Sequence, residues 1–200
     1  VVGINRLANI NDSLAGIVHD KWPKVGLLQE GLAGVNAVGI AVRDMALSTD
    51  RESAQKAKER ILDGRSSIGK AWEKIKPLLT LPKGKEMFQG ILDARERYIV
   101  VQNQIIKLVE DGKRDEAALY LNAEFQPAAN EYRKRVNALI KFQGDLMDET
   151  GVEAEHIVAA ARTLMLALGG AAVLLGIAIG FLITRGLLKQ LGGEPDYAAD

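Results

Sequence analysis

The 200-residue chain contains no cysteine, two histidines and five prolines, and aromatic residues make up only 5% of it. Without cysteine it can form neither a disulfide nor a thiolate metal site. The histidines, His19 and His156, lie far apart and belong to no metal-binding or catalytic motif. Basic and acidic residues balance at 26 each, so the sequence predicts no polyanion-binding surface. We therefore expect no metal, no cofactor, no nucleic-acid partner and no enzyme activity.

The scarcity of proline, together with abundant Ala, Leu, Ile, Lys, Glu and Gln, favours an all-α fold. In three stretches, apolar and small residues recur at alternating spacings of three and four, which is typical of helices packed in a bundle. Long helices joined by short turns predict an antiparallel up-down-up-down four-helix bundle. The three stripes are Leu28, Leu32, Val35, Gly39, Val42 and Ala46; Ala54, Ala57, Ile61, Gly64, Ile68, Ala71, Ile75 and Leu78; and Met87, Ile91, Ala94, Tyr98, Val101, Ile105 and Leu108.

Local signals predict where these helices bend and end. Pro23 removes a backbone donor, so it should bend the first helix without dividing it in two. Thr49 or Asp50 can cap the N-terminus of the second helix, and Gly112 can cap the C-terminus of the third. The fourth helix passes Pro127 and then meets no strong breaker. We expect it to continue as one helix into the C-terminal region.

Residues 163–183, TLMLALGGAAVLLGIAIGFLI, contain no charged side chain. At about 1.5 Å per residue, a helix of this length spans roughly 30 Å, the thickness of a bilayer core. We expect this to be the only complete membrane-spanning run, as a continuation of the fourth helix. Residues 5–160 then form the soluble bundle, and residues 1–4, VVGI, are the end of a preceding membrane helix. Arg185 and Lys189 favour the cytoplasmic side for the segment after the span.

Polar residues interrupt the apolar faces at comparable heights in the predicted bundle. Counted along each helix from the turns farthest from the membrane, most of them fall roughly 10 to 25 Å from that end. Arginines and amides in a half-buried layer suit a small carboxylate ligand, because a guanidinium offers two parallel hydrogen bonds to an anion. Alternatively, each arginine lays its stem over the apolar seam and keeps its charge in water, as we expect for Arg51, Arg60, Arg65, Arg97 and Arg135. The predicted ligand-binding residues are Asn36, Arg43, Arg95, Tyr98, Gln102, Gln126, Asn130 and Arg133.

Several stretches are together similar to one known family. They are DKWPKV at 20–25, AVRDMALS at 41–48, RERY at 95–98, EDGKRDEA at 110–117 and EFQPAANEY at 124–132. They resemble the four-helix-bundle sensor domain of methyl-accepting chemotaxis proteins, the bacterial chemoreceptors. The membrane exit, ITRGLLKQLGGEPDYA, resembles the opening of a HAMP linker, which would assign residues 184–200 to that linker.

The resemblance implies a homodimer in the bacterial inner membrane, with the bundle in the periplasm and cytoplasmic signalling partners reached through a C-terminal part. A ligand would displace the fourth helix slightly along the membrane normal, and it can do so only by binding one state better than the other.

The resemblance also bears on the ligand. In the amino-acid receptors of this family, arginines of the first helix hold the ligand carboxylates. Arg43 falls at one of these positions, whereas Gly34 and Gly39 fall at the other two. Ala128 replaces the threonine of the family's Gln-Pro-Thr segment. The amino-acid site is therefore incomplete, and we expect an organic acid in preference to an amino acid.

Two other interpretations stay open. The same kind of module is fused in other bacteria to histidine kinases or nucleotide cyclases, so the sequence that follows Asp200 would distinguish these outputs. The bundle could also dock a periplasmic binding protein and bind no small molecule itself.

Overall fold

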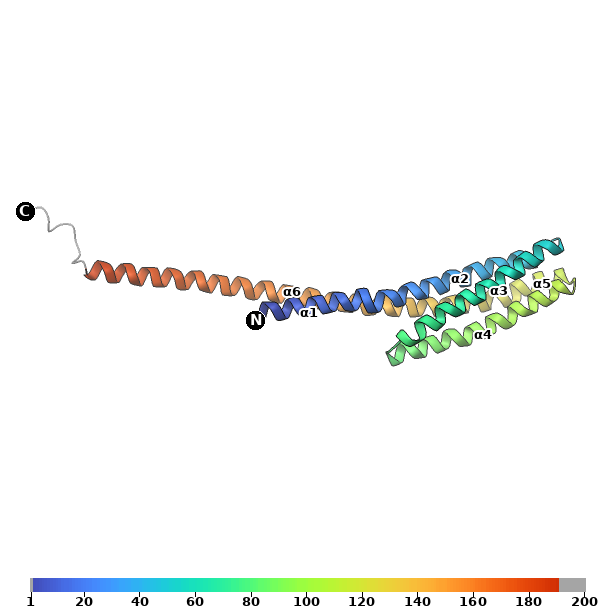
Figure 1. The fold of residues 1–200 in the computed structure, drawn as a ribbon, viewed down its shortest axis with the longest axis horizontal. Coiled ribbons are helices and arrows are strands. Elements are labelled where there is room, and N and C mark those ends of the chain that lie inside the picture. The colour runs from blue at the N-terminus through green and yellow to red at the C-terminus, as the bar shows by residue number, and fades with distance from the viewer. Residues whose placement is uncertain (1, 191–200) are drawn as a thin grey trace, which may run out of the picture. The chain divides into compact units, whose positions relative to one another are not determined.

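The computed structural model describes the backbone of residues 2–190 and the side chains of residues 8–188. It divides into two compact units, one formed by residues 12–151 and the other by residues 1–11 with 152–200. The described residues are helical apart from short connections (Figure 1). The α-helices are α1 (Val2–Ala15), α2 (Trp22–Ala46), α3 (Arg51–Ile75), α4 (Pro82–Glu110), α5 (Arg114–Tyr120) and α6 (Gln126–Gln190).

The unit formed by residues 12–151 is an antiparallel four-helix bundle of α2, α3, α4 and the segment that runs from α5 into α6 (Figure 1). The stripes of small and apolar residues face one another in its interior. Fully buried side chains come from every helix and include Leu28, Ile61, Ile105 and Tyr132. The predicted all-α bundle is confirmed.

Helices α2 and α3 approach each other closely because glycines face large side chains. A Cβ at Gly31 would overlap the ring of Trp72, and a Cβ at Gly34 would lie 2.7 Å from Cγ1 of Ile68. Such contacts are shorter than carbon atoms tolerate, so a larger residue at either position would force the helices apart. Gly34 therefore serves the packing of α2 against α3.

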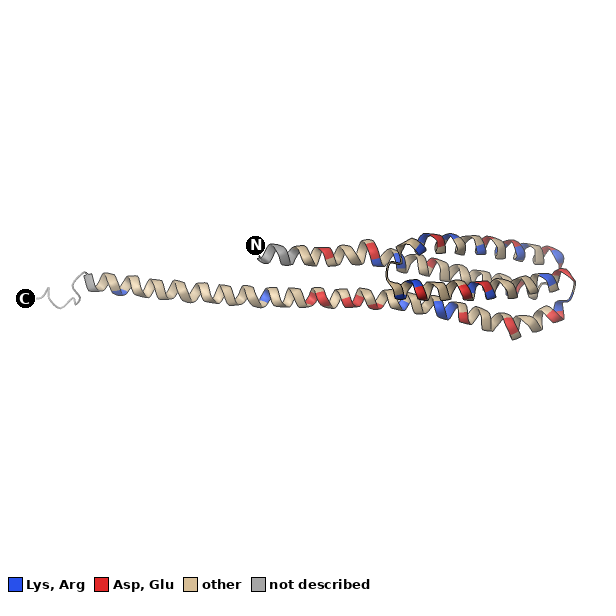
Figure 2. Ribbon diagram, turned by 90° about the horizontal axis from the view of Figure 1, so that it is seen from below, with Lys and Arg blue, Asp and Glu red and all other residues tan. Residues whose placement is uncertain are grey.

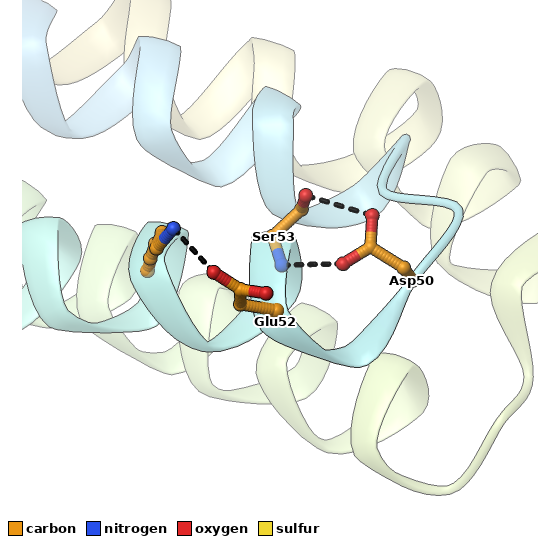
Figure 3. Close-up of polar contacts among 4 residues, drawn as sticks. Asp50, Glu52 and Ser53 are labelled. Carbon is orange, nitrogen blue, oxygen red and sulfur yellow. Dashed lines mark hydrogen bonds and ion pairs between the residues drawn. The ribbon is translucent and has the colours of Figure 1, made fainter.

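The helix ends follow the predicted signals. Of the two candidate caps, Asp50 caps α3: its carboxylate oxygens accept hydrogen bonds from the backbone N–H and the hydroxyl of Ser53, both at 2.8 Å (Figure 3). The Ser53 backbone N–H is also the main reason why the pKa of Asp50 is lowered. At the end of α4, Gly112 adopts a φ of 76°, and the N–H of Lys113 reaches back to the carbonyl of Leu108 at 2.8 Å. This is the Schellman arrangement that favours glycine.

Two prolines, Pro23 and Pro127, lie where a long helix continues past them, and each is preceded by a π-helical turn. The π segment η1 (Gly16–Lys21) comes before Pro23, and η3 (Leu121–Phe125) comes before Pro127. In both, a backbone N–H bonds five residues back, from Trp22 to Ile17 and from Gln126 to Leu121. Because proline cannot donate the next helical bond, the wider turn absorbs the change of register and the helix continues. The helix thus continues past Pro23 undivided, as predicted, with a change of hydrogen-bond register before it.

The end of α3 differs from the predicted stripe. The helix gives way to a 3-10 turn, η2 (Lys76–Leu78), before the connection to α4. A 3-10 turn has about 3.0 residues per turn instead of 3.6, so it rotates the following side chains ahead of the stripe. Leu78 is therefore 38% exposed, and Leu79 is the buried residue at 3%. The prediction of Leu78 as a core residue was wrong.

The second unit includes the C-terminal part of α6. Every described side chain of residues 162–188 is exposed, and this part of the helix carries almost no charge (Figure 2). The helix from Arg114 to Leu188 contains a window of mean hydropathy 2.5, none of which is buried. It is long and apolar enough to cross a membrane, and it includes the predicted span at 163–183.

The helix Ala8–Ala46 also passes this test of length and hydropathy, with a mean hydropathy of 1.4. The expectation of a single such segment was therefore too narrow. However, 39% of its window is buried, because much of this helix lies in the bundle core. The predicted stub at residues 1–4 has a helical backbone from residue 2 onward, but its side chains lie outside the described residues, as do residues 191–200 of the predicted linker.

Candidate ligand-binding groove

A groove lies between α2 and the start of α6 and encloses about 280 Å³. Two of its polar side chains, Asn36 and Arg43, come from α2. The other two, Gln126 and Arg133, come from α6. The structure thus brings four of the predicted site residues together in one place. The remaining lining residues are Gly39, Ile40 and Phe125.

The groove has the chemistry of an anion site. It is lined by two arginines and two amides and by no carboxylate. Within the described part of the chain, the Arg43 guanidinium has no hydrogen bond or ion pair. Arg133 donates through Nη2 to Oδ1 of Asn130 at 2.6 Å, so Asn130, itself outside the groove, orients one of the two cations. Both guanidinium groups could pair with the oxygens of a carboxylate.

The π-helical turn before Pro127 contributes to this site. Phe125 is the last residue of η3 and Gln126 is the first of α6, and both line the groove. Local changes from α to π hydrogen bonding occur frequently at functional sites, because they present side chains that a regular helix would turn away. The Gln-Pro step therefore positions the amide of Gln126 through the backbone.

Tyr98 lies beneath the groove. Its side chain is only 2% exposed, and its ring packs against Phe125 and Tyr132, each with centroids 5.3 Å away. The hydroxyl donates to the backbone carbonyl of Val35 at 3.1 Å and lies 3.7 Å from where a Cβ would stand at Gly39. The Tyr98 hydroxyl therefore lies directly under Gly39, one of the residues that line the groove. A larger side chain at position 39 would contact this hydroxyl.

The remaining predicted residues, Gln102 and Arg95, face α3 and lie away from the groove. Gln102 is completely buried, and its Oε1 accepts a hydrogen bond from Nε of Arg65 at 2.6 Å. The Nη2 atom of Arg95 lies 3.4 Å from the position of a Cβ at Gly69. The eight predicted residues therefore do not form one site in the structure.

The sequence predicts a surface position for Arg65. In the structure it is half-buried, and its Nη2 atom is fully buried. Its spacing gives a signal that could have identified it, because Arg65 lies four residues after Ile61 and three before Ile68, two buried residues of α3.

Comparison with known proteins identifies the kind of domain. The sequence profile of a family described as a four helix bundle sensory module for signal transduction matches residues 1–157. The chain belongs to this family. A separate comparison with curated proteins found no match. The resemblance to the sensor domain of chemotaxis receptors is thereby confirmed, and the chain is a sensory module of a membrane-associated signalling family.

Burial sets the titration of the two core tyrosines of the sensory module. Tyr98 and Tyr132 both have a raised pKa, mainly because burial disfavours the charged phenolate, and that of Tyr132 is raised to about 12. The hydroxyl of Tyr132 accepts a hydrogen bond from Nε1 of Trp72 at 2.7 Å, which opposes this shift without cancelling it. Both tyrosines therefore stay neutral at any physiological pH.

The raised pKa predicts alkaline destabilisation of the sensory module. Tyr132 titrates near pH 10 in an unfolded chain but only near 12 in the folded one. Its contribution to stability is thus complete below pH 10 and is lost as the pH rises to 12, at about 1.4 kcal/mol per pH unit. The free energy of unfolding can be measured by urea unfolding followed by circular dichroism. Between pH 10 and 12 it should fall less steeply with pH in Tyr132→Phe than in the wild type, by this amount. Equal slopes for the two proteins would contradict the prediction.

Proposed function

We propose that the chain is the sensor and membrane-spanning part of a methyl-accepting chemotaxis protein that binds a small organic acid. The observation that carries this proposal is the groove between α2 and α6, where Arg43 and Arg133 meet with no carboxylate to neutralise them. A dicarboxylate, a tricarboxylate or an aromatic acid would supply the missing negative charge. Asn36 and Gln126 would hydrogen-bond its remaining oxygens.

In this proposal residues 163–183 cross the bacterial inner membrane, with the bundle in the periplasm and residues 184–200 opening a cytoplasmic HAMP linker. The exposed apolar side chains of residues 162–188 support the span. Contact of such a surface with water is unfavourable, whereas contact with the lipid tails of a bilayer is favourable. A ligand that binds one position of α6 better than another would shift this helix along the membrane normal. Cytoplasmic signalling partners would read that shift.

We further propose a homodimer formed through α2. Eight exposed residues between Trp22 and Leu47, the C-cap of α2, recur at alternating spacings of four and three, which is the pattern of a helix-pairing seam. Trp22, Ile40 and Leu47 on this seam are about 60% exposed, far more than apolar side chains of this size prefer. Since the seam includes Asn36 and Arg43, a second copy would close the groove. The exposed seam consists of Trp22, Gly26, Gln29, Ala33, Asn36, Ile40, Arg43 and Leu47.

The test is a thermal-shift screen of the whole chain in detergent micelles against succinate, citrate, benzoate and the common amino acids. An acid present at a hundred times its dissociation constant should stabilise the bundle by about 2.7 kcal/mol and raise Tm by several degrees. Sedimentation of the same samples would report whether the acid favours a dimer. If no acid raises Tm, the proposed ligand class is wrong, and the alternative that the bundle docks a periplasmic binding protein is favoured.

A further inference from the structure

The interior between α3 and α4 contains two hydrogen-bond donors that lack acceptors. Arg65 and Gln102 are joined by the bond from Nε to Oε1 at 2.6 Å. However, Nη2 of Arg65 and Nε2 of Gln102 are both buried, and neither has a partner among the described residues. Buried polar atoms are nearly always paired, so two adjacent donors without acceptors call for one that the protein chain does not supply.

The same region carries uncompensated positive charge. Arg95 of α4 lies against Gly69, one helical turn along α3 from Arg65. Burial lowers the pKa of Arg65; Tyr98 opposes this shift, and the charge of Arg95 adds to it. In the described part of the chain no carboxylate forms an ion pair with either arginine. A half-buried guanidinium beside a second one is unfavourable unless an anion neutralises them.

The neighbouring hydroxyl does not satisfy these donors. Tyr98, one turn before Gln102, is close enough for the Gln102 amide to lower its pKa, against the larger opposite effect of burial. Yet Nε2 of Gln102 does not meet the geometry of a hydrogen bond to it, and the Tyr98 hydroxyl hydrogen is used on the carbonyl of Val35. An acceptor from outside the chain is still required.

We propose that Arg65 and Gln102, with Arg95 beside them, bind a small oxyanion between α3 and α4. A planar ion with one negative charge, such as nitrate or the carboxylate of a small acid, offers oxygens to both free donors, and a guanidinium edge matches such an ion. This α3–α4 anion site is separate from the groove, which is built from α2 and α6. It would hold α3 against α4 by replacing a repulsion with shared hydrogen bonds.

The test compares the whole chain in detergent micelles with sodium nitrate, sodium acetate or sodium gluconate at one ionic strength. Gluconate serves as the reference because it is too large for a buried site. We expect nitrate or acetate to raise Tm by several degrees with saturation, as binding to the folded state requires. The ¹⁵N resonances of the Arg65 Nε–H and the Gln102 side-chain amide should shift over the same concentration range.

Variants separate a specific site from a general salt effect. Arg65→Gln should lose the saturable rise, whereas Arg51→Gln, at an exposed position of the same helix, should keep it. Because Arg65→Gln could itself weaken folding, the double variant Arg65→Met with Gln102→Leu provides a second test. Removing both partners together leaves no orphaned donor, so it should fold at least as stably in gluconate and show no response to the anions.

The outcomes distinguish the sources of the ligand. If the rise in Tm saturates with both nitrate and acetate, an inorganic oxyanion is sufficient to fill the site. If it saturates with acetate alone, the ligand is a carboxylic acid. An unsaturating rise of equal size in wild type and Arg65→Gln, or no rise with either ion, would overturn the proposal. Arg43→Ala should leave the response to nitrate unchanged, so failure of the organic-acid groove and failure of the α3–α4 anion site can be told apart.

Discussion

Replacing Trp72 with alanine is expected to lower the free energy of unfolding of the bundle by about 3–5 kcal/mol, the usual loss for a fully buried Trp or Phe. The side chain is only 3% exposed, so both its transfer from water and its packing are lost. Folded domains are more stable than their unfolded chains by only about 5–15 kcal/mol. The substitution should therefore remove a large share of the stability.

The reason is that Trp72 joins α3 to the three other helices of the bundle. Its ring fills the space left by Gly31 on α2. It meets the ring of Phe88 on α4 edge to face, with centroids 6.0 Å apart, and its Nε1 donates to the hydroxyl of Tyr132 on α6 at 2.7 Å. Truncation leaves a cavity at this junction and removes the partner of a buried hydroxyl.

Urea unfolding of the whole chain in micelles, followed by circular dichroism, measures the loss. Leu62→Ala on the same helix is the control, because Leu62 is 47% exposed and should change the free energy by less than about 1 kcal/mol. Trp72→Phe should lie between these two variants, since it retains a ring but loses the hydrogen-bond donor. A loss for Trp72→Ala no larger than that for Leu62→Ala would contradict the central role of this side chain.

Much of the fold was predictable because its determinants are local. The apolar stripes repeat at the helical period, and the caps at Asp50 and Gly112 rest on the chemistry of one or two residues. The burial of Leu79 in place of the predicted Leu78 could not be predicted in the same way. It depends on a 3-10 turn, which stripe counting cannot detect because it assumes the α-helical period throughout.

For the candidate site, the sequence predicted only how far along the bundle axis the residues lie. Counting residues from the turns places Asn36 and Gln126 at similar heights, and the structure joins these two with Arg43 and Arg133 in the groove. The count does not say which neighbouring helix a side chain faces. Gln102 was therefore grouped with the groove although it faces α3 and Arg65. That choice depends on the rotation of α4 in the packed bundle, which is decided by tertiary contacts.

Within the groove, Arg43→Ala is expected to weaken binding of the organic acid by about 10- to 100-fold. This is the loss that follows when a charge-assisted hydrogen bond worth about 1.5–3 kcal/mol is removed. Arg43 is exposed and has no partner in the described part of the chain, so its removal should leave Tm without ligand unchanged. Arg43→Lys should recover part of the affinity, because it keeps the charge but cannot bind both carboxylate oxygens in parallel.

Isothermal titration of the whole chain in micelles with succinate, citrate and benzoate measures this effect. Arg51→Ala is the matched control, since it removes the same charge from an exposed position outside the groove. Arg133→Ala should also weaken binding, and together with Arg43→Ala it should cost less than the sum of the two losses if both arginines hold one carboxylate. Unchanged affinity in both single variants would mean that the acid binds elsewhere. Full additivity would instead place the two guanidinium groups on different carboxylates of a di- or tricarboxylate, and would thereby favour succinate or citrate over benzoate.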